Sequence, residues 1–152
     1  MKLKSKRDPA SASARLDRLA QLPLRLGKAT DDAALHAAIV KEAAELLDAQ
    51  RVLLVLHLDS APLHIASAIL QPGESAEALL QAVAPWLDEA MTGGASRLRH
   101  GPPGAEPVEQ RSCLVAPLLA AQVSLGCLYA DIEGAHGRFD DAERALLALL
   151  AG

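Results

Sequence analysis

The stretch SCLVAPLLAAQVSLGCLYAD, residues 112–131, constrains the fold most, because it consists of two apolar runs that meet at a turn. Sequential apolar runs joined by a short turn pair as antiparallel strands, so strands are predicted at about 111–118 and 122–132. Pro117 donates no hydrogen bond to a strand ladder and therefore belongs at a strand end or edge, next to the turn. Gly126 inside a strand marks a bulge, or a close approach by another backbone or a ligand.

Hydrophobic spacing predicts further elements on both sides of this hairpin. Pro85 is expected to kink or divide the third of the predicted helices. Asp140 and Glu143 have the spacing of a capping box, which predicts the start of a last helix. The elements before the hairpin are a helix near Leu16, Leu19 and Ala20, a helix at about 32–48 capped by Thr30 or Asp31, strands at 51–59 and 63–70, a helix from Ser75 to about Met91, and a short strand near 97–100.

This order of elements predicts an α+β fold with a central antiparallel sheet. Helices from both ends of the chain cover one face, and the segment 71–110, with loops and short helices, covers the other. Residues 1–13 are expected to be a disordered tail, and residues 14–152 a single domain. The apolar helical stripe before Gly152 leads us to expect that the last helix continues in a longer protein.

Composition excludes several classes of function. The formal net charge is −4 and aromatic residues make up 2% of the chain, which argues against nucleic-acid binding. No apolar run is long enough to span a bilayer, and the basic N-terminus lacks the apolar run of a signal peptide. With 2 Cys, a reducing, cytoplasmic setting is expected. The 5 His show no metal-ligand spacing, so no metal is predicted.

The hairpin and the last helix resemble the C-terminal half of a GAF domain. The resembling pattern is apolar-Pro-Leu, a turn, apolar-Gly-x-Leu with an acidic residue, and a Phe-led helix with paired leucines. The stretch TDDAALHAAIVKEAAELLDAQRVLLVLHLD resembles the first helix and strand of that family, and the resemblance extends over about 14–151. The matching hairpin and helix positions are Val115, Pro117, Leu118, Leu125, Gly126, Leu128, Asp131, Phe139, Asp140 and Leu146–Leu147.

The resemblance implies a non-catalytic regulatory or sensory module of a bacterial signalling or transcription-regulating protein. Such modules bind small molecules, mediate dimerisation, or do both. A ligand site is expected between one sheet face and the segment 71–110. That segment has no Cys to attach a bilin, and the chain lacks the Asn-Lys-x-x-Phe-Asp-Glu signature of cyclic-nucleotide-binding members. A haem with His100 as axial ligand stays open, although a solvated loop His is favoured, and the cofactor is left unknown.

Six residues are candidates for ligand binding, and each has a structural alternative. Arginines suit an anionic ligand but also a solvated rim, a Trp at a helical position is usually core, and a His on a strand is usually a hydrogen-bonded structural residue. The candidates are His64, Trp86, Arg97, Arg99, His100 and Arg111.

Two alternatives to a sensor remain. One GAF branch consists of free methionine-(R)-sulfoxide reductases with nucleophilic and resolving cysteines, which would give Cys113 and Cys127 a chemical role. The turn contains no Gly or Asn to fix the register: one register makes the two cysteines direct neighbours, and a shift of one residue puts them on opposite faces. Core packing is favoured, because buried free Cys behaves as a small hydrophobe.

The other alternative is a ligand-free dimerisation module. Its homodimer would form through the terminal helices, with apolar stripes at Leu16/Leu19 and at Leu146/Leu149/Leu150. The same stripes could equally be intramolecular core.

Overall fold

The computed structural model describes residues 31–57, 63–101, 111–120, 123–133 and 139–151. The predicted tail and the helix near Leu16 lie outside these residues. The elements are α3 (Asp32–Leu47), β1 (Arg51–Leu56), β2 (His64–Ile69), α4 (Ala76–Gly93), β3 (Arg97–Gly101), β4 (Arg111–Ala120), β5 (Val123–Glu133) and α5 (Asp141–Ala151).

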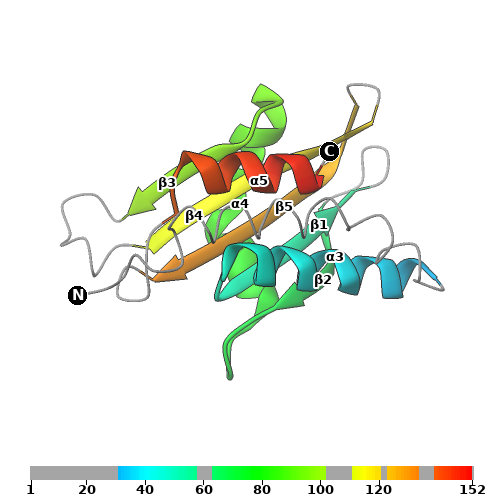
Figure 1. The fold of residues 1–152 in the computed structure, drawn as a ribbon. Helices are drawn as coiled ribbons and strands as arrows, with labels where there is room; N and C mark the ends of the chain where they lie inside the picture. Colours follow the sequence, from blue (N-terminus) through cyan, green and yellow to red (C-terminus); the bar gives the residue numbers. More distant parts are fainter. Residues whose placement is uncertain (1–30, 58–62, 102–110, 121–122, 134–138, 152) are drawn as a thin grey trace.

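The strands form one 5-stranded sheet in the order β2-β1-β5-β4-β3. Every neighbouring pair is antiparallel. Helices α3 and α5 cover one face and α4 covers the other, and Figure 1 shows the first two in front of the sheet with α4 behind it. The predicted α+β architecture is confirmed, and α4 covers the face away from α3 and α5. Of the rest of the segment 71–110, residues 97–101 form the edge strand β3 of the sheet, and residues 102–110 lie outside the described residues.

Short polar side chains fix the starts of the helices. The Asp31 carboxylate accepts a hydrogen bond from the Ala34 backbone N–H, at 2.8 Å. At the last helix the Asp140 carboxylate accepts from Glu143 N, and the Glu143 carboxylate accepts from Asp140 N, both at 3.0 Å. This reciprocal pair satisfies two N–H groups that have no partner within the helix, and it confirms the predicted capping box.

Helix α4 is one helix of 18 residues with Pro85 in its interior, and not two short helices. Its buried residues Leu79, Val83 and Leu87 lie on both sides of the proline along the helix. Pro85 itself faces solvent. Water can therefore bond the carbonyl that loses its partner there, while burial of the apolar stripe holds the helix together. Gly94, in the left-handed conformation, ends it.

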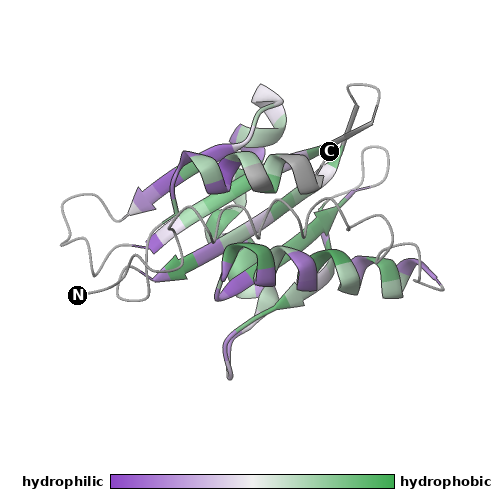
Figure 2. Ribbon diagram, in the orientation of Figure 1, coloured by the Kyte–Doolittle hydropathy of each residue, from purple (hydrophilic) through white to green (hydrophobic). Residues whose placement is uncertain are grey.

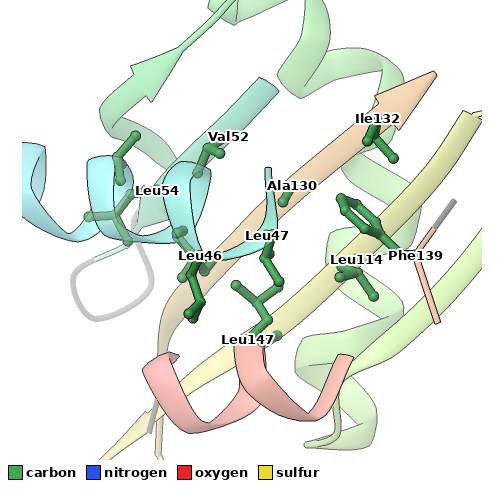
Figure 3. Packing of buried hydrophobic residues seen from close by; sticks show 13 residues of the cluster. Leu46, Leu47, Val52, Leu54, Leu114, Ala130, Ile132, Phe139 and Leu147 are labelled. Atoms are coloured by element: carbon green, nitrogen blue, oxygen red, sulfur yellow. The ribbon is translucent and has the colours of Figure 1, made fainter. Parts of the chain in front are cut away.

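Alternating strand residues build two separate cores. On β1, Val52 and Leu54 pack toward α3 and α5, whereas Leu53 and Val55 pack toward α4. Figure 3 shows the first core, in which Leu46 and Leu47 of α3 meet Leu147 of α5 over the sheet. Phe139 also lies in this core. Both sides of the central strands are therefore buried, as the nearly continuous apolar sequence of β1 predicts.

The edge strand β3 differs from the central strands in polarity. Figure 2 shows β3 as hydrophilic and β1 as hydrophobic. Because β3 pairs with β4 on one side only, its Arg97, Arg99 and His100 occupy an open edge of the sheet. Charged residues on an edge strand discourage pairing with further strands.

Gly126 lies at a bulge and at a close approach of two backbones, as predicted. The β4–β5 register shifts between Leu118 and Leu119, opposite Gly126. Gly126 has φ of +146°, and an added Cβ would overlap the carbonyl oxygen of Val55 on β1. Only glycine fits such a position without strain. The pairing of β4 with β3 ends at Val115. Pro117, two residues further on, pairs with β5 only, and a proline without an N–H group is tolerated there.

Candidate functional site

A pocket of about 380 Å³ lies between α4 and the sheet. Helix α4 contributes a mostly apolar wall, and β1, β3, β4 and β5 contribute a floor that carries arginines. The pocket is lined by Arg51, Glu74, Ser75, Ala78, Leu79, Ala82, Val83, Trp86, Arg99, Gly101, Arg111, Cys113 and Tyr129.

The completely buried carboxylate of Asp131 organises the floor of the pocket. Its Oδ2 lies 2.6 Å from Nη2 of Arg51, and its Oδ1 lies 2.9 Å from Nη1 of Arg111. The strand pairing brings these three side chains together, because Arg51 of β1 is opposite Asp131 of β5, and Arg111 lies on the neighbouring strand β4. Burial alone would lower the pKa of Arg51, but the hydrogen bonds and charge of Asp131 outweigh burial, and the pKa is raised. The Arg51 guanidinium therefore remains cationic beside the pocket.

Tyr129 connects this ionic group to a cysteine. Its hydroxyl oxygen lies 2.6 Å from Oδ2 of Asp131 and 3.3 Å from Sγ of Cys113. The hydroxyl has one proton and the carboxylate is the stronger acceptor, so the hydroxyl donates to Asp131. Burial, together with the nearby Cys113 and Asp131, raises the pKa of Tyr129. Tyr129 therefore stays neutral and keeps the proton that it donates to Asp131.

Glu74 ties the turn before α4 to the sheet. Its Oε2 accepts a hydrogen bond from Nη1 of Arg51 at 3.2 Å, and its Oε1 accepts from the Gln71 backbone N–H at 2.9 Å. The Gln71 side chain in turn donates to the Gln50 carbonyl, at 3.0 Å. Ser75, the N-cap of α4, follows directly in the sequence. The start of α4 is therefore fastened to β1 through one carboxylate.

Arg99 lies over the Trp86 ring, with its guanidinium carbon 5.4 Å from the ring centroid. The same guanidinium donates to the Glu89 carboxylate, at 2.5 Å. A cation over an indole face is a favourable contact. The two residues close one side of the pocket by joining β3 to α4.

The two cysteines share a face of the hairpin but do not meet. Cys113 is opposite Asp131, and Cys127 is opposite Pro117. This register matches neither of the two considered from the sequence, because β4 extends to Ala120, which pairs with Val123, and the bulge adds a residue to β5. Four positions along a strand correspond to about 13 Å, whereas a disulfide needs Cα atoms within about 7 Å. Both cysteines are free and buried.

Comparison with known proteins identifies the family. A family model described as GAF domain matches residues 33–152. The chain belongs to the GAF domain family. A search of curated protein sequences finds no significant match.

Solved structures agree with this GAF assignment at the level of the fold. A free methionine-R-sulfoxide reductase from Neisseria meningitidis has a TM-score of 0.67 and 21% identity, with 92% of this chain and 85% of that chain covered. The GAF domain of a putative sensor histidine kinase from Pseudomonas syringae pv. tomato has a TM-score of 0.65 and 19% identity, with 97% and 89% covered. A putative GAF sensor protein from Burkholderia vietnamiensis has a TM-score of 0.65 and 17% identity, with 92% and 84% covered.

Three of the six residues predicted for ligand binding line the pocket of this GAF domain: Trp86, Arg99 and Arg111. His64 does not, because it lies exposed on β2 and pairs with Leu56, whose side chain packs toward α3. Arg97 is exposed and lies beside Gly93, at the other end of α4 from the pocket.

His100 faces away from the pocket and does not lie in a loop. It is a residue of β3, and its Nδ1 lies 2.7 Å from Oγ of Ser112. Leu98, two residues earlier, packs against the α3 and α5 core, so His100 shares that side of the sheet. The expectation that His100 is a solvated loop residue is therefore wrong, and its side of the sheet is not the side of the pocket.

The sequence reading missed Arg51, Glu74 and Tyr129 as pocket residues. Arg51 carries a usable signal, because it has the same parity on β1 as Leu53 and Val55, which face α4. Among the described residues, no group of three or more His, Cys, Asp or Glu side chains could hold a metal ion. In the same part of the chain, no helix has both the length and the apolar character to cross a membrane.

Proposed function

We propose that this GAF domain is a regulatory sensory module of a signalling protein and binds a small molecule between α4 and the sheet. The observation that carries the proposal is the pocket of about 380 Å³, with an apolar wall and a floor of partly buried arginines that the buried carboxylate of Asp131 holds in place. Concave sites of this size, mostly apolar with a few oriented polar groups, are typical of small-molecule binding. The similar structures include GAF domains named as sensors.

We propose a non-catalytic role, although one similar structure is a free methionine-R-sulfoxide reductase. A redox pair needs thiols that ionise readily and can reach each other. Burial raises the pKa of Cys127 to about 12. Burial also raises the pKa of Cys113, to about 11, against a lowering by its contact with Tyr129. The distance between the two cysteines and the raised pKa of both thiols support a role in core packing rather than in redox catalysis.

The test of ligand binding is a thermal-shift screen with a library of small metabolites, together with native mass spectrometry of the purified protein. A ligand that binds the native state raises the melting temperature. The variant Ala82→Phe fills the pocket from α4 and is expected to abolish the shift. The matched control, Ala37→Phe, places the same side chain on the exposed surface of α3. Equal shifts in both variants would contradict a ligand site between α4 and the sheet.

We also propose that the module dimerises through its terminal helices and works in the reducing cytoplasm, in bacteria. Free thiols at both cysteines support the reducing setting. Light scattering on the purified chain measures the oligomeric state directly. A monomer at micromolar concentration would contradict the dimer. A monomer that still shows the ligand-dependent thermal shift would show that ligand binding does not depend on dimerisation.

A further inference from the structure

Two arginines of the pocket floor share one buried carboxylate, and Arg111 has a further partner in Glu133, at 3.3 Å, which does not line the pocket. The guanidinium groups of Arg51 and Arg111 both bind the single carboxylate of Asp131. Asp131 is completely buried, whereas the Arg51 side chain is 15% exposed and that of Arg111 is 28% exposed. Burying two cations on one anion costs free energy unless a further anion lies near. This site therefore favours a second carboxylate on the pocket side.

Glu74 supplies that second carboxylate, in an arrangement that a ligand can take over. Its side chain is 31% exposed, and it reaches Arg51 from the turn before α4, at the mouth of the pocket. A partly exposed ion pair of this kind contributes little free energy. An incoming carboxylate can therefore replace Glu74 on Arg51 at small cost, and the charge of the site stays the same.

The rest of the pocket suits an apolar body attached to such a carboxylate. Leu79, Val83 and Trp86 line it from α4, and Cys113 lines it from β4. The other lining cations, Arg99 and Arg111, pair with Glu89 and Glu133, and neither of these carboxylates lines the pocket. Glu74 is the one carboxylate among the described residues that line the pocket, so one carboxylate with an apolar body matches its place on Arg51 and the apolar wall.

We propose that the pocket takes a small apolar monocarboxylate, and that its carboxylate displaces Glu74 from Arg51 and so releases the turn before α4. This inference rests on the proposed function of the pocket. Glu74 acts as an internal competitor of the ligand. Its displacement removes the carboxylate that joins the Gln71 N–H to Arg51, so occupancy of the pocket is converted into a change at the N-terminal end of α4.

Removal of the competitor tests this inference. Glu74→Gln keeps an oxygen that can accept from the Gln71 N–H but removes the charge that holds Arg51. Glu77→Gln is the matched control, because it removes one negative charge from the exposed first turn of α4. The probes are 3-phenylpropionate and its uncharged analogue 3-phenylpropionamide. Trp86, the 1 Trp of the chain, reports binding by fluorescence because it lines the pocket.

The expected result is specific to one variant and one probe. Glu74→Gln tightens the binding of 3-phenylpropionate by about two- to five-fold, the range for loss of a weak competing ion pair. Glu77→Gln leaves the binding of the acid unchanged, and the amide binds all variants equally and more weakly than the acid. In the wild type, the acid also speeds hydrogen exchange at the Gln71 amide, because it frees that N–H from Glu74.

Four outcomes overturn the inference. Equal tightening by Glu74→Gln and Glu77→Gln would show a general charge effect. Equal binding of acid and amide, or tighter binding of inorganic phosphate than of the acid, would exclude the apolar monocarboxylate while leaving the pocket a ligand site. If no probe binds any variant, the inference also fails, and the proposed function then stands or falls separately on the metabolite screen and the Ala82→Phe variant.

Discussion

Cys113 and Cys127 lie on the same buried face of the β4–β5 hairpin, four register positions apart. Each packs under α4, and each thiol has a raised pKa because burial disfavours the thiolate. The relationship answers the question that the sequence raises about these residues, and it leads to two predictions on their chemistry.

The native protein is expected to react very slowly with a disulfide reagent such as Ellman's reagent at pH 8. The thiolate is the reactive form, and the pKa values of about 11 and 12 leave very little of it at that pH. The denatured protein is the control and should release signal for 2 thiols at once. Rapid labelling of the native protein, or a disulfide between the two cysteines after mild oxidation, would contradict the described packing.

The free energy of unfolding is expected to fall as pH rises above about 9. Folding raises the pKa of Cys127 from 9.0 to about 12, so the folded state keeps a proton that the unfolded state releases. The stabilisation is therefore complete below pH 9 and is lost as pH rises toward 12, by up to about 1.4 kcal/mol per pH unit for one thiol. Urea denaturation of the wild type and Cys127→Ala between pH 8 and about 10.5 measures this difference. Parallel curves for the two proteins would contradict it, since Tyr129 and Cys113 contribute to both.

Gly126→Ala is expected to destabilise the domain by more than about 3 kcal/mol or to prevent folding. The added methyl group would overlap the Val55 carbonyl, and φ of +146° is unfavourable for any residue with a Cβ. Gly73→Ala is the control, because φ is also positive there, at +82°, but no atom lies within 4 Å of the added Cβ. The control is expected to cost about 1 kcal/mol by urea denaturation. Similar losses in both variants would show that backbone strain alone, and not the close approach of β1, requires glycine.

Asp131→Asn is expected to destabilise the domain by about 3–5 kcal/mol, because two largely buried guanidinium groups lose their shared anion. The substitution keeps the size of the side chain, so packing changes little. Glu133→Gln serves as control, since Glu133 pairs with Arg111 from a side chain that is 58% exposed. Its loss is expected to stay within about 1 kcal/mol. Chemical denaturation of both proteins at pH 7 decides: equal stability would mean that Asp131 is not the organising charge.

The sequence was sufficient to predict most of the fold, because few arrangements of helices and strands bury its apolar residues. The predicted helix at 32–48 and the observed α3, Asp32–Leu47, nearly coincide, since Asp31 caps one end and the apolar run of β1 begins soon after the other. Pro85 was overestimated as a helix breaker, because local preference weighs less than burial of the residues on both sides of it. The hairpin register could not be predicted, since it depends on a bulge and on strand lengths that the turn sequence does not encode.

The site was harder to predict than the fold, because it depends on pairings between distant strands. Arg51 looks like a solvated residue in front of an apolar run until β5 places Asp131 opposite it, 80 residues later in the sequence. Asp131 itself was noticed only as an acidic position of the GAF pattern. The short strand predicted near 97–100 is present as β3, but His100 was expected beside the ligand site, and the alternation of strand residues places it on the other side of the sheet.

The sheet separates two side-chain layers that, among the described residues, have no buried residue in common. The layer under α3 and α5 can keep its packing while residues under α4 are exchanged, because each strand offers its odd and even positions to different sides. Ligand preference on the α4 face of the sheet can therefore change without new packing of α3 and α5 on the other face.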